Sequence, residues 1–185
     1  MKPLIICALP RSRTFWLYKY FSLYDNIRCE HEYTAKVDRV EDYFSAMYSQ
    51  EKQFINVDAF SFLSFPFDVI SKANVVFIEK DISRCVESTL EIFPKDHWVH
   101  QKGFKYLYTW YEDMQEVYKE QVEYVIQYEE LDEKLPILHE LIDQEYNSNH
   151  HKTMLEKKLN TSIQYISFQK YNMWQQSYNE HKIYT

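Results

Sequence analysis

A short loop near the N-terminus carries four polar side chains that could bind an anion. It directly follows the apolar run LIICAL at residues 4–9, and it reads P-R-S-R-T at residues 10–14. If the run is a strand and a helix begins where the loop ends, the helix N-terminus adds backbone N–H groups and a positive dipole. The arginines add forked donors that match phosphate or sulfate oxygens. The candidate anion-binding residues are Arg11, Ser12, Arg13 and Thr14. The alternative is a solvated turn in which Thr14 caps the helix.

A second candidate group follows the β-branched run VVFIE at residues 75–79. Lys80 directly follows this run, and Ser88 lies eight residues further on, within a helical pattern. Both side chains could reach one anion at the edge of a sheet. A third segment, Y-E-E-L at residues 128–131, directly follows the apolar run at residues 123–127. We interpret its two carboxylates as charges that favour a helix N-terminus.

A histidine and two carboxylates stand at the ends of two further predicted strands. His31 and Glu32 follow residues 27–30, and Asp58 follows residues 54–57. His31 suits a general base because its ordinary pKa lies near neutrality. Glu32 is its rival if burial raises the pKa of that carboxyl, and Asp58 is a third candidate. A surface loop without catalytic function is the alternative for the His31-Glu32 pair.

Strands and helices alternate along the chain about five times. The predicted strands are residues 4–9, 27–30, 54–57, 75–79 and 123–127. The first predicted helix begins at Thr14. The others span residues 39–49, 81–92, 100–120, 136–145, 150–158 and 168–180. This alternation favours an α/β fold, with a mostly parallel central sheet flanked by helices on both faces. In such sheets ligands bind at the carboxyl ends of the strands, where the polar groups described above stand.

Two predictions concern packing within these helices. Pro136 is expected in the first turn of its helix, where a missing N–H is tolerated. The helix at residues 100–120 is expected to bury one stripe of its surface as core. The residues of that stripe are Phe104, Leu107, Tyr108 and Tyr111.

The overall composition limits the class of protein. The chain has 185 residues, a net charge of -7 and 45% hydrophobic residues, which predicts one globular domain over residues 1–185. The acidic balance argues against a nucleic-acid partner. No apolar run approaches the ~20 residues of a membrane span, and the first apolar run is too short for a signal peptide. A cytoplasmic location is therefore expected.

The number of glycines and the positions of the cysteines exclude further classes of site. Gly103 is the only glycine, so glycine-based nucleotide motifs such as G-x-G-x-x-G are excluded. Cys7, Cys29 and Cys85 lie far apart in the sequence, and we interpret them as reduced, mostly buried thiols. No histidine stands near a cysteine at the spacing of zinc ligands, so no metal is expected.

Taken together, these segments resemble the P-loop sulfotransferases, which use 3′-phosphoadenosine 5′-phosphosulfate (PAPS). The family's first loop reads P-[KR]-S-G-T-x-[WL], which residues 10–16 match except at Arg13. Its 3′-phosphate motif reads R-x-P-x-D-x-x-x-S, and Lys80 and Ser88 fall on its Arg and Ser. Residues 128–131 match its Y-E-[DE]-L. The resemblance spans residues 4–131, followed by a helical tail at about 146–185. It is strongest to the small bacterial and phage branch, where H-E is common near the second strand.

The resemblance implies a P-loop NTPase-like architecture, PAPS as co-substrate and a role for each candidate residue. Arg11 would stabilise the leaving phosphate oxygen, and the loop with its hydroxyls would hold the 5′-phosphate. Lys80 and Ser88 would hold the 3′-phosphate, and His31 or Glu32 would act as general base. The acceptor would be a small molecule or a glycan with a hydroxyl or amine, no metal would be needed, and a homodimer is possible. Trp16 could stack on the adenine, but core packing is the preferred interpretation.

Residues of the first loop and of the 3′-phosphate motif depart from the family pattern, and two other functions stay open. Arg13 replaces glycine, Lys80 replaces arginine and so loses the bidentate fork, and Ile82 replaces proline. One alternative is a nucleotide-binding phosphotransferase or kinase, against which the Walker lysine and a Mg²⁺-binding pair are missing. The other is a catalytically inactive interaction protein that kept the fold.

Overall fold

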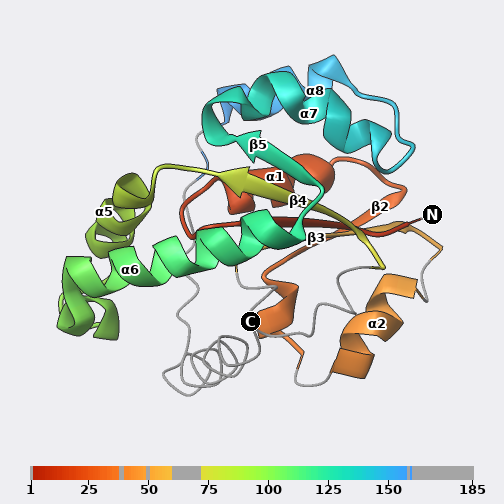
Figure 1. Ribbon diagram of the computed structural model, residues 1–185. Coiled ribbons are helices and arrows are strands. Elements are labelled where there is room, and N and C mark those ends of the chain that lie inside the picture. The colour runs from red at the N-terminus through yellow and green to blue at the C-terminus, as the bar shows by residue number, and fades with distance from the viewer. Residues whose placement is uncertain (1, 38–39, 49–50, 60–71, 158, 160–185) are drawn as a thin grey trace.

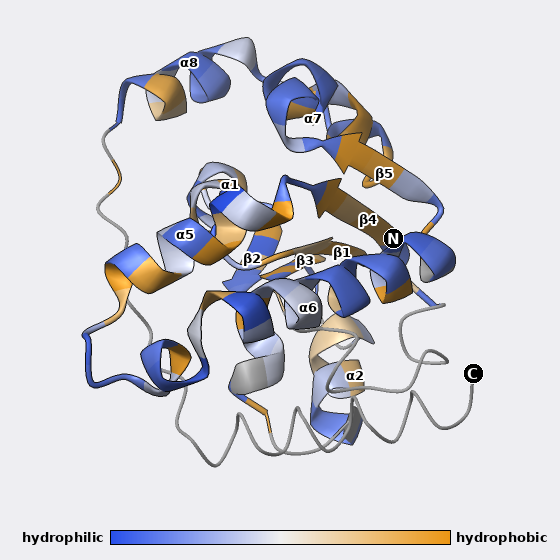
Figure 2. Ribbon diagram, turned by 60° about the vertical axis from the view of Figure 1, so that its left-hand side comes forward, coloured by the Kyte–Doolittle hydropathy of each residue, from blue (hydrophilic) through white to orange (hydrophobic). Residues whose placement is uncertain are grey.

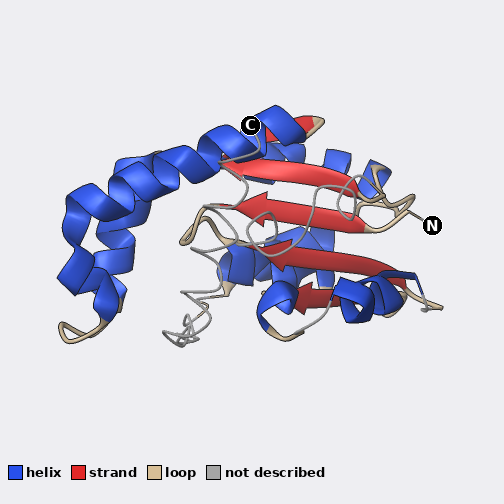
Figure 3. Cartoon of the chain, turned by 60° about the horizontal axis from the view of Figure 1, so that its bottom comes forward, coloured by secondary structure: helices blue, strands red, loops and turns tan. Residues whose placement is uncertain are grey.

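A five-stranded, all-parallel sheet forms the centre of the molecule (Figures 1 and 3). The computed structural model describes residues 2–37, 40–48, 51–59, 72–157 and 159. The strands are β1 (Leu4–Ala8), β2 (Ile27–His31), β3 (Gln53–Asp58), β4 (Asn74–Glu79) and β5 (Tyr124–Gln127). Their order in the sheet is β2-β3-β1-β4-β5, and all four neighbouring pairs are parallel. The predicted α/β class and parallel sheet are confirmed.

Burial explains why these segments are strands. Every residue of β1 and β3 is buried, as expected of central strands covered on both faces. Ile6 pairs with Val57 on one side and with Val76 on the other. Figure 2 shows these apolar strands between helices with largely hydrophilic outer surfaces. The edge strand β5 buries only Ile126 fully.

Three helices cover one face of the sheet, above it in Figure 1. They are α1 (Thr14–Phe21), α7 (Leu131–Glu140) and α8 (Ser148–Glu156). Leu4, Ile6 and Ala8 share a buried cluster with Leu17 of α1 and Leu135 of α7. Because side chains alternate along a strand, the intervening residues of β1 face the opposite side.

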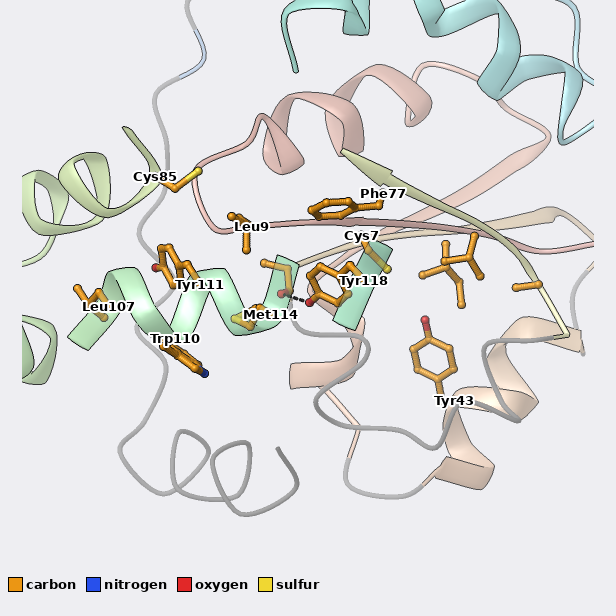
Figure 4. Close-up of a cluster of buried hydrophobic side chains, with 14 of the residues drawn as sticks. Cys7, Leu9, Tyr43, Phe77, Cys85, Leu107, Trp110, Tyr111, Met114 and Tyr118 are labelled. Carbon is orange, nitrogen blue, oxygen red and sulfur yellow. Dashed lines mark hydrogen bonds between the residues drawn. The ribbon is translucent and has the colours of Figure 1, made fainter. Parts of the chain in front are cut away.

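The opposite face is covered by α2 (Val40–Tyr48) and α6 (Trp98–Gln121), and α5 (Ile82–Ile92) packs against α6 beyond the carboxyl ends of the strands (Figure 1). Figure 4 shows the cluster on this face, which includes Cys7, Phe77 and Tyr118. The hydroxyl of Tyr118 donates to the carbonyl oxygen of Ala59 over 2.6 Å. This bond fixes α6 to the chain segment directly after β3.

Helix α6 is kinked at Gly103, whose φ of 76° and ψ of 176° lie in a region that only glycine occupies readily. The predicted stripe is correct for Leu107 and Tyr111, which are buried, but wrong for Phe104, which is 42% exposed. Phe104 directly follows the kink, and the buried stripe begins one turn later. It consists of Leu107, Trp110, Tyr111, Met114 and Tyr118.

The predicted start of α7 at Pro136 is wrong, because the helix begins at Leu131 and encloses the proline. Asp132 and Glu133 occupy the first turn, where acidic side chains favour the helix dipole. Predicted helix 150–158 corresponds to α8, and predicted helix 168–180 lies outside the described residues. A single domain over the whole chain stays a prediction. No helix among the described residues has both the length and the apolar character to cross a membrane.

Candidate active site

The parallel topology brings the predicted polar segments to one edge of the sheet. The loop after β1, the start of α5 after β4 and the segments after β2 and β3 all leave the carboxyl ends of their strands. A short 3-10 helix, η1 (Tyr33–Ala35), follows β2, and a second, η2 (Tyr128–Glu130), follows β5. Loops at this edge are the usual ligand-binding segments of such sheets.

The β1–α1 loop bends without glycine. Arg11 and Arg13 have φ values of 73° and 62°, in the left-handed region that glycine prefers. Each such residue costs roughly 1–2 kcal/mol relative to ordinary conformations. Thr14 is the first residue of α1, and Arg13 is the N-cap residue without a side-chain cap bond, so capping by Thr14 is wrong. The first amides of α1 lack intrahelical acceptors and face this loop.

Arg11, Lys80 and Ser88 converge beside the loop. The Nε of Arg11 donates to the Oγ of Ser88 over 3.2 Å. The ammonium of Lys80 donates to the carbonyl oxygen of Arg11 over 2.8 Å and lies 4.5 Å from the ring centroid of Tyr128. Three segments that are far apart in the sequence thus meet at one place, as the sequence predicts.

The electrostatics of this group favour a bound anion. Burial lowers the pKa of Arg11 and of Lys80, and the charges of Arg11 and Arg84 lower the pKa of Lys80 further. Arg84 lies in the first turn of α5 and is exposed, with its Nη1 3.9 Å from the Oε1 of Glu129. Because the three cations repel one another, an anion between them would relieve the repulsion. Sequence reasoning did not find Arg84; its only signal was its place in the same motif.

The side chains of Ser12 and Arg13 contact residues other than Arg11, Lys80 and Ser88. Ser12 is fully buried, and its Oγ lies 3.6 Å from the Sγ of Cys85. The Nη1 of Arg13 donates to the Oδ2 of Asp132 over 2.9 Å, and its Cζ lies 4.1 Å from the ring centroid of Trp16. The structure therefore does not bring the Arg13 guanidinium together with that of Arg11.

Trp16 is packed on both faces. Its ring stacks on Tyr20 with centroids 5.4 Å apart, and Arg13 covers the other face. Its Nε1 donates to the carbonyl oxygen of Met154 in α8 over 3.2 Å, and His151 of α8 contacts Asp132 over 3.1 Å. These contacts support the interpretation of Trp16 as a packing residue.

His31 lies directly beside the start of α1. Its Nε2 is 3.2 Å from the Oγ1 of Thr14 and 3.6 Å from the Oε1 of Glu32. The side chain is 15% exposed, and burial lowers the pKa of His31 to about 4. The imidazole is therefore neutral at pH 7 and has a nitrogen lone pair that can accept a proton.

Glu32 and Asp58 form a carboxyl pair behind His31. Glu32 has a φ of 51° in the left-handed region, and its carboxyl hydrogen-bonds Asp58. Burial raises the pKa of Glu32 well above its usual range, and the Asp58 charge raises it further. Asp58 is fully buried and accepts bonds from Thr34 and from the Asn56 amide. The structure thus brings the three candidate bases together.

Two further observations delimit the site. A hollow of about 380 Å³ lined by Tyr24, Tyr146 and His150 lies beside α8, and Gln144 in its wall contacts Asn26, which precedes β2. It therefore lies at the amino edge of the sheet, away from the groups described above. Among the described residues, no three His, Cys, Asp or Glu side chains are grouped so that they could hold a metal ion.

Comparisons with known proteins bear on the fold. No protein-family model and no curated protein sequence matches this chain. Among solved structures, the chain is similar to mouse sulfotransferase SULT7A1 in complex with PAP, with a TM-score of 0.58 and 13% sequence identity. The similarity covers 87% of this chain and 68% of the mouse chain. The fold of this chain is therefore sulfotransferase-like, with a five-stranded parallel sheet flanked by helices.

Proposed function

We propose that this chain is a sulfotransferase that transfers a sulfuryl group from PAPS to a hydroxyl or amine acceptor. The observation that carries the proposal is the convergence of Arg11, Lys80 and Ser88 at the carboxyl edge of a sulfotransferase-like sheet. A buried, neutral histidine stands at the same edge. The fold neighbour was solved with PAP, the desulfated form of that co-substrate.

The reaction needs positive charge where the leaving group forms. The acceptor oxygen bonds to sulfur while the bond from sulfur to the 5′-phosphate oxygen breaks, and that electron pair stays on the phosphate. The transition state resembles that of phosphoryl transfer, where catalysis is mostly positioning and charge stabilisation. Arg11 is half-buried and begins the turn into α1, so we assign it to the leaving oxygen.

The two phosphates of the co-substrate would bind on either side of Arg11. Lys80 and Ser88 would hold the 3′-phosphate. The amides at the start of α1, with the hydroxyls of Ser12 and Thr14, would hold the 5′-phosphate. Arg13 could join them after leaving Asp132. Cation side chains supply the charge that a metal would supply elsewhere, so the proposal needs no metal.

The base is assigned to the pair His31 and Glu32, with His31 as the proton acceptor. His31 is neutral at pH 7 because burial lowers its pKa to about 4, and its Nε2 contacts Thr14 in the first turn of α1. The acceptor proton would pass to this nitrogen as the acceptor oxygen attacks sulfur. A base with a pKa near 4 is weak, and the developing anion beside it would raise that pKa during transfer.

The remaining parts of the proposal rest on sequence. The adjacent His31 and Glu32 favour the small bacterial and phage branch, and the acceptor is a small molecule or a glycan. A cytoplasmic location and a homodimer stay predictions. Neither a nucleotide phosphotransferase nor an inactive interaction protein is favoured by a specific contact among the described residues.

Calorimetric titration with adenosine 3′,5′-bisphosphate tests the proposal, with ATP and AMP as controls. We expect selective binding in the micromolar range that weakens strongly in Arg11→Ala and Lys80→Ala. Lys152→Ala is a matched control, because it removes an exposed lysine of α8 that is not part of the proposed site. Labelled PAPS with a panel of hydroxyl and amine acceptors then tests turnover. Equal affinity for ATP would contradict the proposal.

A further inference from the structure

A closed hydrogen-bond network surrounds the carboxylate of Asp58. Its Oδ2 accepts from the backbone N–H of Thr34 over 3.1 Å and from the side-chain amide of Asn56 over 3.1 Å. The hydroxyl of Thr34 also donates to this oxygen. Three donors therefore meet at one carboxylate oxygen. Asp58 has no solvent-exposed surface, so these donors take the place of water.

Glu32 is placed against this carboxylate by strained backbone. Its left-handed φ of 51° turns the chain inward directly after β2, and its carboxyl hydrogen-bonds Asp58. The Oε2 of Glu32 also lies 3.4 Å from the backbone nitrogen of Ala59. A hydrogen bond between two carboxyl groups needs a proton, because two carboxylates have only acceptors. Asp58 accepts from three donors, whereas Glu32 has one long contact with a backbone N–H, so the proton belongs to Glu32.

We propose that Asp58 is a positioning residue that keeps one proton on Glu32, so that His31 is the proton acceptor beside the start of α1. The inference rests on the proposed function for its catalytic meaning, but the protonation itself does not. The protonated carboxyl fixes the side chain of Glu32 3.6 Å from the Nε2 of His31. It also keeps a negative charge from standing directly beside the base.

The other charged and titratable groups around the pair are compatible with this arrangement. Lys36, after η1, forms an ion pair with Glu30 over 3.0 Å, and Lys19 of α1 lowers the pKa of His31. From α6, Tyr118 faces both carboxyls, and burial raises the pKa of its hydroxyl well above the usual range. Burial therefore favours the neutral form of both Tyr118 and Glu32.

Infrared spectroscopy of the purified chain at pH 7 tests the protonation directly. Glu32→Gln should remove the carbonyl band of a protonated carboxyl from the wild-type spectrum. Glu30→Gln is the matched control: Glu30 pairs with Arg28 over 3.1 Å and with Lys36, so its substitution should remove a carboxylate band. If Glu32→Gln also removes a carboxylate band, Glu32 is ionised and the inference is overturned.

The positioning role has a second test in the pH dependence of kcat/KM. Asp58→Asn removes a charge that raises the pKa of both Glu32 and His31, so the acidic limb of the profile should shift to lower pH. Glu32→Gln should exceed Glu32→Ala in kcat/KM by at least tenfold, because Gln keeps a donor toward Asp58. An unmoved limb in a folded Asp58→Asn, or equal loss in both Glu32 variants, would overturn the role.

The two proposals fail separately. The infrared measurement needs neither co-substrate nor acceptor, so it reports on Glu32 even if the chain binds no nucleotide. Lack of binding to adenosine 3′,5′-bisphosphate would end the proposed function and leave the carboxyl pair standing. Binding and turnover with an ionised Glu32 would support the proposed function and overturn the proposed proton on Glu32.

Discussion

The two halves of the carboxyl edge of the sheet differ in what stabilises their ionisable side chains. On the side of β1 and β4, Arg11 and Lys80 are half-buried cations, and the charge of Arg11 lowers the pKa of Lys80. Arg11 donates to the hydroxyl of Ser88, and Lys80 donates to the carbonyl oxygen of Arg11. On the side of β2 and β3, His31, Glu32 and Asp58 are more deeply buried, and neighbouring protein groups supply their hydrogen bonds, including Thr14, Thr34 and Asn56. The first half gains from an anion brought by a ligand, whereas the second already has its partners in the protein.

The two halves should therefore respond to different solution conditions. Repulsion between half-buried cations is relieved by a bound phosphate and screened by salt. A buried acid pair beside a neutral imidazole is shielded from salt and responds to pH instead. The four predictions below test this division, beginning with the largest effect.

Loss of Arg11 should weaken nucleotide binding most. Arg11→Gly removes the guanidinium and also relieves the left-handed backbone at this position. We expect affinity for adenosine 3′,5′-bisphosphate to fall about 10- to 100-fold, since a charged hydrogen bond contributes about 1.5–3 kcal/mol. Calorimetry with circular dichroism as a folding control measures this. An unchanged affinity would mean that the anion binds elsewhere, and it would contradict the assignment of anion binding to the half that contains Arg11.

Acid should destabilise the second half. Burial lowers the pKa of His31 to about 4, against an ordinary value of 6.5. The unfolded chain therefore takes up a proton at higher pH than the folded chain, and stability falls as the pH drops from 6.5 to 4. The loss approaches about 3 kcal/mol. Urea unfolding at several pH values measures it, and His31→Asn should flatten the dependence. Because His139 also has a pKa near 4, His139→Asn serves as the comparison variant.

Rising pH should act on the same half through Glu32, with the opposite sign. The pKa of Glu32 is raised by burial and by Asp58, so the folded chain holds a proton that the unfolded chain releases. Stability is therefore lost as the pH rises through the folded pKa of Glu32. Glu32→Gln should remove this decline with rising pH in urea unfolding. A decline that persists in Glu32→Gln would assign it to another group.

Arg13 should matter less than Arg11. Arg13→Gly removes the ion pair with Asp132 but relieves left-handed strain, so the two effects on stability oppose each other. We expect a change within about 1 kcal/mol, because a partly exposed ion pair contributes about 0–1 kcal/mol. Nucleotide affinity should fall less than in Arg11→Gly, by about threefold to tenfold. A larger loss would show that Arg13 acts with Arg11 and Lys80 in nucleotide binding.

The sequence predicted what depends on local pattern and strand order. The five predicted runs correspond to the five strands, and parallel pairing then placed Arg11, Lys80 and His31 at one edge. The start of α7 was missed because Pro136 is a strong local signal, although the leucines of the helix begin five residues earlier.

Contacts between distant elements were beyond prediction. The pair of Arg13 with Asp132 depends on how α7 packs against α1. The bond of Glu32 with Asp58 depends on the register of β2 against β3, in which His31 lies opposite Val57. Neither strand register nor helix packing can be predicted from the spacing of residues within one segment.

The left-handed arginines of the β1–α1 loop have a consequence for how this protein can evolve. In a glycine-containing loop, curvature and charge reside in different residues and can vary independently. In this chain Arg11 and Arg13 supply both the turn and a cation. A substitution at either position that eases the backbone also removes a guanidinium, so small adaptive steps in this loop are constrained. Change in substrate preference is then more accessible through residues outside the loop.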